Sequence, residues 1–284
     1  MSILRAATLF ALPLACALLL PARAPAQGWG TLKGQVIYVG NEKPNQKADL
    51  NMHKDERACL KAAKGAIIKD DLVVNPKNKG LRWVVVWLTV DKDGKADHEA
   101  PLPIHPSLKD VKEKSVVMDQ PCCKFEPHIA ILREGQVFIG KNSSELTHNM
   151  RVIGIGPNSK NTKNLTLTAK SEQQIGTEPW KVTVTRPGRP NLPNPVNCDI
   201  HRWMSGWLFV FAHPYVAVTD EDGKFTIDKV PAGKFRVVMW HERDIFVLGE
   251  EGKPGDFNGR VVTIDPKQPT DMGKIELKDK PKDD

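Results

Sequence analysis

Four residues of the 284-residue chain have the types and spacing to hold one metal ion. The segment CDIHRWM places Cys198, His201 and Met204 three residues apart, and His148 lies fifty residues upstream. One thiolate, two imidazoles and a weak thioether are the ligands of a mononuclear electron-transfer copper site. The thiolate favours Cu(I), the imidazoles hold both oxidation states, and the weak sulfur tunes the potential. We therefore expect one type 1 copper ion on these four residues.

Each part of this pattern is weak by itself, and other chemistries compete with it. A buried free thiol beside a surface histidine would explain Cys198 and His201 equally well. Zinc could occupy a Cys-His-His set, but structural zinc prefers more thiolates and Met204 is no zinc ligand. A trinuclear oxidase cluster needs His-x-His pairs, and none of the eight histidines is so spaced. We expect no enzymatic activity from this chain alone.

The residues around the pattern resemble the cupredoxin family. A Phe-x-Pro strand is followed by a glycine turn, a short apolar run, an asparagine and His148-Asn149; the residues are Phe125, Pro127, Gly135, Val137–Ile139 and Asn142. The second cluster, Cys-x-x-His-x-x-Met-x-Gly, ends at Gly206 and is similar to that of short-loop, plastocyanin-like members such as amicyanin.

The resemblance implies the same four ligands, residue by residue. It also implies that Asn149 ties the ligand-bearing strand to the cysteine loop. Two features depart from the family: Ile200 stands where many members have proline, and the stretch before Cys198 lacks the usual aromatic strand. The second departure leaves the strand boundaries open.

The cupredoxin arrangement further implies a route for electrons. The imidazole matching His201 breaks the surface there, while those matching Cys198 and His148 stay buried. We expect electrons to pass through His201, with Trp203 exposed beside it as a contact surface. The alternative is that Trp203 folds back onto the sandwich as a structural plug.

A second module surrounds the first. The stretch Ala217–Glu242, AVTDEDGKFTIDKVPAGKFRVVMWHE, resembles the carboxypeptidase-regulatory-like, transthyretin-like β-sandwich. Its Asp-Gly and Pro-x-Gly signals mark hairpin turns, and Thr31–Gly40 and Leu81–Val90 look like its opening strands. The predicted fold is all-β: a cupredoxin Greek-key β-sandwich inserted in a transthyretin-like β-sandwich, as in exported proteins of planctomycete type. The expected parts are 28–110 and 214–280 for the outer sandwich and 111–213 for the copper domain.

The remaining pattern is one of short strands and turns, without sustained helical periodicity. Helical turns are expected only near Asp55–Ala63 and Ser107–Glu113, and long loops over Pro157–Lys163 and Arg186–Asn197.

Export is expected from the first 26 residues, 1–26, which have the pattern of a signal peptide. A charged start and an apolar run precede the small-x-small site Ala24–Ala26. A membrane anchor is the competing interpretation, but the run is short and stops at Pro21. We expect a periplasmic or extracellular protein with no membrane span. The net charge of +7 is not clustered, so no nucleic-acid partner is expected.

Three other cysteines beyond the expected signal peptide and three histidines need their own explanations. In an oxidising compartment we expect a disulfide between Cys59 and Cys123, with Cys122 as the adjacent alternative. A second metal site on three remaining histidines is possible, but hydrogen bonding at a domain junction is the preferred interpretation; they are His128, His213 and His241.

The sequence thus favours an electron carrier whose redox partner, a cytochrome or a dehydrogenase for example, it does not name. One alternative is a non-redox protein whose sandwich binds cell-surface material or carbohydrate, with structural or stored copper. Another is an accessory that supplies electrons to a redox enzyme. Met204 favours the carrier, because a weak axial thioether suits redox cycling and storage does not require it.

Overall fold

The structure is a computed structural model, and it describes residues 28–50, 53–182, 184–186, 189–190, 193–243, 246–247 and 257–279. The expected signal peptide lies outside these residues. The described helices are short: α1 (Glu56–Ala62) and the 3-10 turns η1 (Pro106–Leu108) and η2 (Gly156–Asn161). None of the described helices is long and apolar enough to cross a membrane. Strands make up the rest of the regular structure, so the all-β prediction is confirmed.

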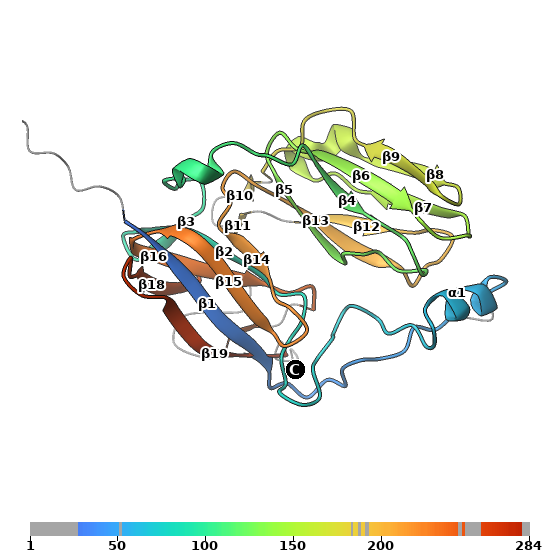
Figure 1. Cartoon of the computed structure of the whole chain (residues 1–284), viewed down its shortest axis with the longest axis horizontal. Coiled ribbons are helices and arrows are strands. Elements are labelled where there is room, and N and C mark those ends of the chain that lie inside the picture. Colours follow the sequence, from blue (N-terminus) through green and yellow to red (C-terminus); the bar gives the residue numbers. More distant parts are fainter. Residues whose placement is uncertain are drawn as a thin grey trace, which may run out of the picture.

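Two sheets are built from the two ends of the chain, and they face each other (Figure 1). In one sheet the order is β15 (Lys224–Pro231), β1 (Trp29–Tyr38), β19 (Thr270–Lys278) and β17 (Phe246–Val247). The other has the order β14 (Val216–Val218), β2 (Val85–Lys92), β16 (Gly233–Trp240) and β18 (Arg260–Ile264), with β3 (Lys95–Asp97) beside β2. We call this pair of sheets the outer sandwich.

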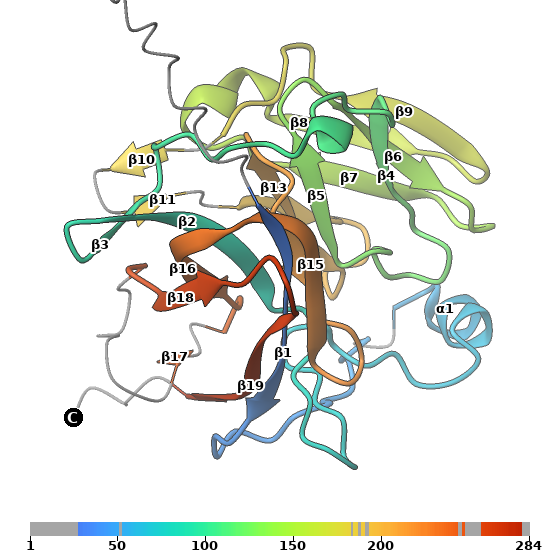
Figure 2. The ribbon, with the colours of Figure 1, turned by 60° about the vertical axis from the view of Figure 1, so that its left-hand side comes forward.

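The strands between these two parts form a second pair of sheets, which we call the inner sandwich (Figure 2). Its larger sheet has the order β5 (Ile129–Arg133), β13 (Ser205–Phe211), β12 (Asn194–Asn197), β7 (His148–Val152) and β8 (Lys163–Leu167). Its smaller sheet has the order β4 (Ser115–Met118), β6 (Val137–Asn142) and β9 (Ser171–Ile175). A two-stranded ribbon, β10 (Val184–Arg186) and β11 (Arg189–Pro190), precedes β12.

One segment departs from the expected division of the chain. Residues 28–110 were expected to belong to the outer sandwich as a whole. Instead, the chain leaves that sandwich after β1 and carries α1 across to the inner one (Figures 1 and 2). There, Leu50, Cys59 and Ile67 are buried in the same apolar core as Phe138 and Val210. Burial of these side chains holds the excursion against the inner sandwich.

Strand β13 belongs to both cores, because its side chains alternate between its two faces. Leu208 and Val210 point into the core of the inner sandwich. Phe209 and Phe211 are buried in a separate cluster with Trp87 of β2. The two sandwiches therefore share a buried aromatic interface, which a fragment limited to 111–213 would leave open to water.

The stretch expected to be a loop before Cys198 contains a strand instead. Asn194–Asn197 forms β12, which pairs with β13 on one side and β7 on the other. Its sequence, NPVN, has little strand propensity, but its place between two strands and the burial of Val196 impose the extended backbone. The neighbouring strands β13 and β7, rather than its own residue types, therefore make this segment a strand.

The shared interface gives a stability prediction. Phe209 is 1% exposed, so Phe209→Ala should lower the free energy of unfolding by about 3–5 kcal/mol through lost burial and a cavity. Val261→Thr, at a 44% exposed position of β18, should change it by less than about 0.5 kcal/mol. Urea unfolding followed by circular dichroism measures both. Equal effects of the two substitutions would contradict a tightly packed interface.

Candidate metal centre

The loop that carries three candidate ligands joins β12 to β13. These strands pair as far as Asn197 and Ser205, so Cys198 and Met204 stand at the mouth of a hairpin. The Met204 N–H donates to the carbonyl of His201 at 2.9 Å, and the Cys198 N–H donates to the carbonyl of Met204 at 3.3 Å. The loop thus closes on itself and holds its three candidate ligands at one end of the sheet.

The fourth candidate comes from the neighbouring strand. His148 is the first residue of β7, which pairs with β12. One ligand atom each of His148, Cys198 and His201 lies within 4.8 Å of the other two. The imidazole centroids of the two histidines are 4.5 Å apart. All four predicted ligands, Met204 included, are at most 2% exposed.

The imidazole of His148 lacks a polar partner among the described residues. Its side chain is fully buried, and neither ring nitrogen has a hydrogen-bond partner. A buried polar group without a partner costs about 1–3 kcal/mol, and here one ring has two such atoms. A metal ion beside Cys198 and His201 would satisfy one nitrogen directly, so the residues fit a copper ion of the predicted kind.

Burial also sets the charge of the cluster. Burial, and to a lesser extent the neighbouring His201, lowers the pKa of His148 to about 4. Burial raises the pKa of the Cys198 thiol, although backbone N–H groups of Asn149, His201 and Ile200 lower it in part. The cluster therefore keeps neutral imidazoles and a thiol until a cation stabilises the thiolate.

Two asparagines hold the ligand-bearing segments together. The side-chain oxygen of Asn149 accepts from the N–H groups of Asp199 at 2.8 Å and Ile200 at 3.2 Å, so it ties β7 to the cysteine loop as the resemblance implies. Asn142 is fully buried, and its amide donates to the carbonyls of Leu146, Leu167 and Thr168. This fixes the turn that leads into His148.

The expected surface position of His201 is not observed, and this part of the predicted electron route is wrong. The side chain of His201 is fully buried. Its Nε2 lies 3.2 Å from Oδ2 of Asp55, and its ring centroid lies 5.0 Å from that of His53. The two residues that cover His201, His53 and Asp55, lie in the excursion just before α1. The cupredoxin pattern has no counterpart to this excursion.

Trp203 lies between the two expected arrangements, an exposed contact surface and a structural plug folded back onto the sandwich. It is half-buried, its Nε1 donates to the carbonyl of Cys123 at 3.2 Å, and its ring packs edge-on against His53 and His201. A surface cavity of about 570 Å³ opens beside it, lined by the ligand loop and by the excursion around α1, residues 49–50 and 53–69, which we call the covering segment; the lining includes Leu50, Lys69, Ile200 and Arg202.

A disulfide joins the covering segment to the inner sandwich. It links Cys59 of α1 to Cys123, with their Cα atoms 5.5 Å apart. Cys122, the adjacent alternative, is a free thiol whose pKa is raised to about 11 by burial and by Glu126. The sulfur atoms of the disulfide and a nitrogen of His201 lie within 4.8 Å of one another. The bond therefore fixes the covering segment directly over the candidate ligand.

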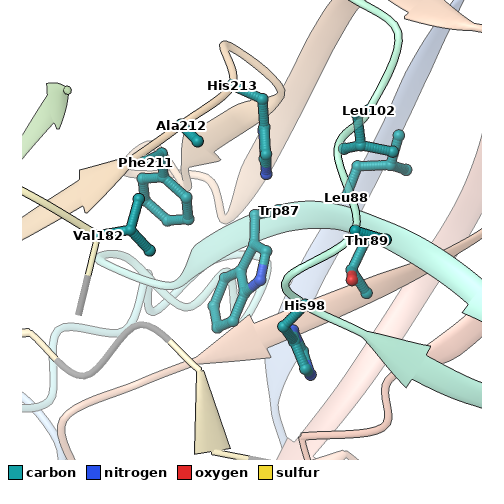
Figure 3. Close-up of a pocket in the computed structure, with 10 residues that line it drawn as sticks. Trp87, Leu88, Thr89, His98, Leu102, Val182, Phe211, Ala212 and His213 are labelled. Atoms are coloured by element: carbon teal, nitrogen blue, oxygen red, sulfur yellow. The ribbon is translucent and has the colours of Figure 1, made fainter. Parts of the chain in front are cut away.

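The three remaining histidines lie apart from the cluster. His128 is buried, with Nδ1 3.0 Å from the carbonyl oxygen of Ser205 and Nε2 against the carboxylate of Glu242. Neither His128, His213 nor His241 belongs to any group of three ligand atoms that could hold a metal among the residues described. His213 borders a small cavity between Trp87, Leu102 and Phe211 at the sandwich junction (Figure 3).

Sequence reasoning missed His53 and Asp55. Both lie in a polar stretch, HKDER, that carries no periodicity. One signal was available: Asp55 lies four residues before Cys59, and a disulfide to Cys123 brings that segment near the Phe-x-Pro strand.

Comparison with known proteins gives no family by sequence. No protein-family model matches the chain, and no curated protein matches it. Solved structures similar to it include a purple cupredoxin of Nitrosopumilus maritimus (15% identity, 34% of this chain, 99% of that one, TM-score 0.26). An oxidised amicyanin variant is 17% identical, with 41% of this chain and 99% of that one covered and a TM-score of 0.27. A copper-containing nitrite reductase of Thermus scotoductus is 19% identical, with 39% of this chain and 27% of that one covered and a TM-score of 0.27. With such low identities and TM-scores, the function has to be inferred from the site itself.

The disulfide gives a first prediction for this site. Peptide mapping under non-reducing conditions should recover a peptide that links Cys59 to Cys123. Replacing both cysteines by alanine should lower the free energy of unfolding by about 4 kcal/mol, because the bond closes a long loop in the unfolded chain. Cys122→Ala serves as the control and should keep the crosslink. A free Cys59 in the map would contradict the assignment.

A second prediction concerns His241, which is 2% exposed. Burial lowers its pKa to about 4, so from about pH 6.5 down to 4 the unfolded chain binds a proton that the folded one does not. The free energy of unfolding should therefore fall with falling pH, by about 1 kcal/mol per unit from this residue. Urea unfolding between pH 7 and 4.5 should show a flatter dependence for His241→Gln. Parallel curves would refute this account.

Proposed function

We propose that this protein is an exported electron carrier with one type 1 copper ion. The observation that carries the proposal is the fully buried His148, whose two ring nitrogens lack partners beside Cys198 and His201. Copper bound there would take up and release one electron. The chain supplies the imidazoles of His148 and His201, the sulfur of Cys198 and, from the sequence pattern, the thioether of Met204.

Burial of the ligands favours electron transfer over chemistry on a bound substrate. All four residues are at most 2% exposed, so a substrate could not reach an ion among them without displacing protein. An electron needs no such access. The hydrogen bonds of Asn149 and Asn142 keep the ligands in place, which suits an ion that must change charge with little rearrangement.

Because the covering segment buries His201, a redox partner would have to contact the protein at another point. His201 is covered, but its ring touches His53 and Trp203, and the His53 side chain is 26% exposed. We infer that a partner docks over these two rings and the adjoining cavity. The partner remains unidentified; a cytochrome or a dehydrogenase would suit the role.

The cellular setting is part of the same proposal. A disulfide between Cys59 and Cys123 is typical of proteins outside the cytosol and supports a periplasmic or extracellular location. We interpret the outer sandwich as a carboxypeptidase-regulatory-like, transthyretin-like module with the copper sandwich inserted between β3 and β14. The sheets support this division, since β1 and β2 pair with strands from the end of the chain.

The proposal predicts colour. The copper-loaded protein should show an intense visible band from charge transfer between the thiolate of Cys198 and Cu(II). Cys198→Ser should abolish this band and leave the far-ultraviolet circular dichroism unchanged, because a buried serine of similar size preserves the strands. Absorption spectroscopy after copper titration measures it.

Cys122→Ser is the matched control, because Cys122 is the other free thiol in the part of the chain described. It should keep the full intensity of the band. A colourless wild-type protein with copper bound, or loss of colour in Cys122→Ser, would refute the proposed ligand.

A further inference from the structure

A carboxylate faces the side of His201 that points away from the other candidate ligands. Oδ2 of Asp55 lies 3.2 Å from Nε2 of His201, and the other ring nitrogen, Nδ1, lies 3.9 Å from the sulfur of Cys198. We propose that Asp55 is a positioning residue of the copper centre. It accepts the Nε2 proton of His201 and thereby fixes which nitrogen is presented to the ion.

The hydrogen bond selects one form of the imidazole. A neutral histidine carries its proton on one nitrogen and a lone pair on the other. A carboxylate only accepts, so the proton must be on Nε2 and the lone pair on Nδ1. That lone pair then faces His148 and Cys198, where an ion would sit. Without Asp55 the two forms would compete, and the ring could turn.

The position of Asp55 is itself constrained. It directly precedes α1, and the disulfide from Cys59 anchors that helix beside His201. The N–H of Asp55 donates to Nδ1 of His53 at 3.2 Å, and the ring of His53 packs against His201. The segment that carries the carboxylate is thus held by the disulfide on one side and by the tilted contact of the His53 ring with His201 on the other.

The same atoms could instead bind a second metal ion. Ligand atoms of His53, Asp55 and His201 lie within 4.8 Å of one another. Two distances favour the hydrogen-bonded arrangement. Nδ1 of His53 is 3.7 Å from Oδ2 of Asp55, and that nitrogen already accepts the N–H of Asp55, which leaves it no lone pair for a metal.

The consequence for the proposed function is a change in the preference between copper oxidation states. A carboxylate hydrogen-bonded to a ligating imidazole raises the basicity of the ligand and favours the more highly charged Cu(II). Removing the charge should weaken this preference about tenfold, a rise of about 59 mV in reduction potential for one electron. This part rests on the proposed function.

The experiment has two arms, and the first needs no copper. In the metal-free protein, nitrogen-15 NMR should show His201 protonated on Nε2, with that proton exchanging slowly with water. Asp55→Ala should speed the exchange at least tenfold. The second arm measures the reduction potential of the copper-loaded protein, which should rise by about 59 mV in Asp55→Asn.

Glu56→Gln is the matched control, because it removes one negative charge from the same segment and Glu56 makes no hydrogen bond or ion pair to His201. It should leave both readouts unchanged.

A proton on Nδ1 in the wild type, unaltered exchange in Asp55→Ala, or an unchanged potential in Asp55→Asn would overturn the proposal. Binding of a second metal ion per chain in a zinc titration would also overturn the proposal. If Asp55→Ala does not fold, Asp55→Leu serves in the first arm, because leucine is of similar shape and cannot accept the proton. Failure to bind copper would refute the proposed function alone, since the NMR arm still decides the role of Asp55.

Discussion

The structure depends on the alternation of side chains along β13. The strand begins immediately after Met204, and its two faces serve two cores: Leu208 and Val210 on one side, Phe209 and Phe211 on the other. A shift of one residue would turn each set toward the wrong core and move the ligand loop at the same time. The position of the candidate metal site and the packing of the two sandwiches are therefore set by one register.

Burial of the ligand cluster follows from this arrangement and creates its chemistry. The strands deliver two imidazoles and a thiol to the end of an apolar core, where charged forms are disfavoured. The cluster is polar enough to need a partner and too enclosed to obtain one from solvent. The excursion that carries Asp55 and Cys59 completes the enclosure from outside the inner sandwich.

The sequence alone predicted the parts of this site that are local. Cys198 and His201 lie in one short loop, so their spacing brings them together, and the structure places a ligand atom of each beside one of His148. His148 and Asn149 came from a family pattern, and the structure brings both to the loop. The strand before Cys198 was missed, because the two strands beside it impose it and its own residues do not. The burial of His201 by Asp55 could not be predicted, because the two residues are 146 positions apart in the sequence. The spacing of residues within one segment carries no information about such a distant contact.

The path of β1 bears on how the chain comes to be folded. This strand pairs with β15 and, in parallel, with β19, whose last residue is Lys278. Contacts so distant in sequence form late, because a long loop must first be closed. The inner sandwich is continuous from Ser115 to Phe211 and can assemble earlier, as the chain emerges. Until the outer sandwich forms and brings Trp87 of β2 against it, the aromatic face of β13 is open to water, and exposed apolar surface at this stage favours aggregation.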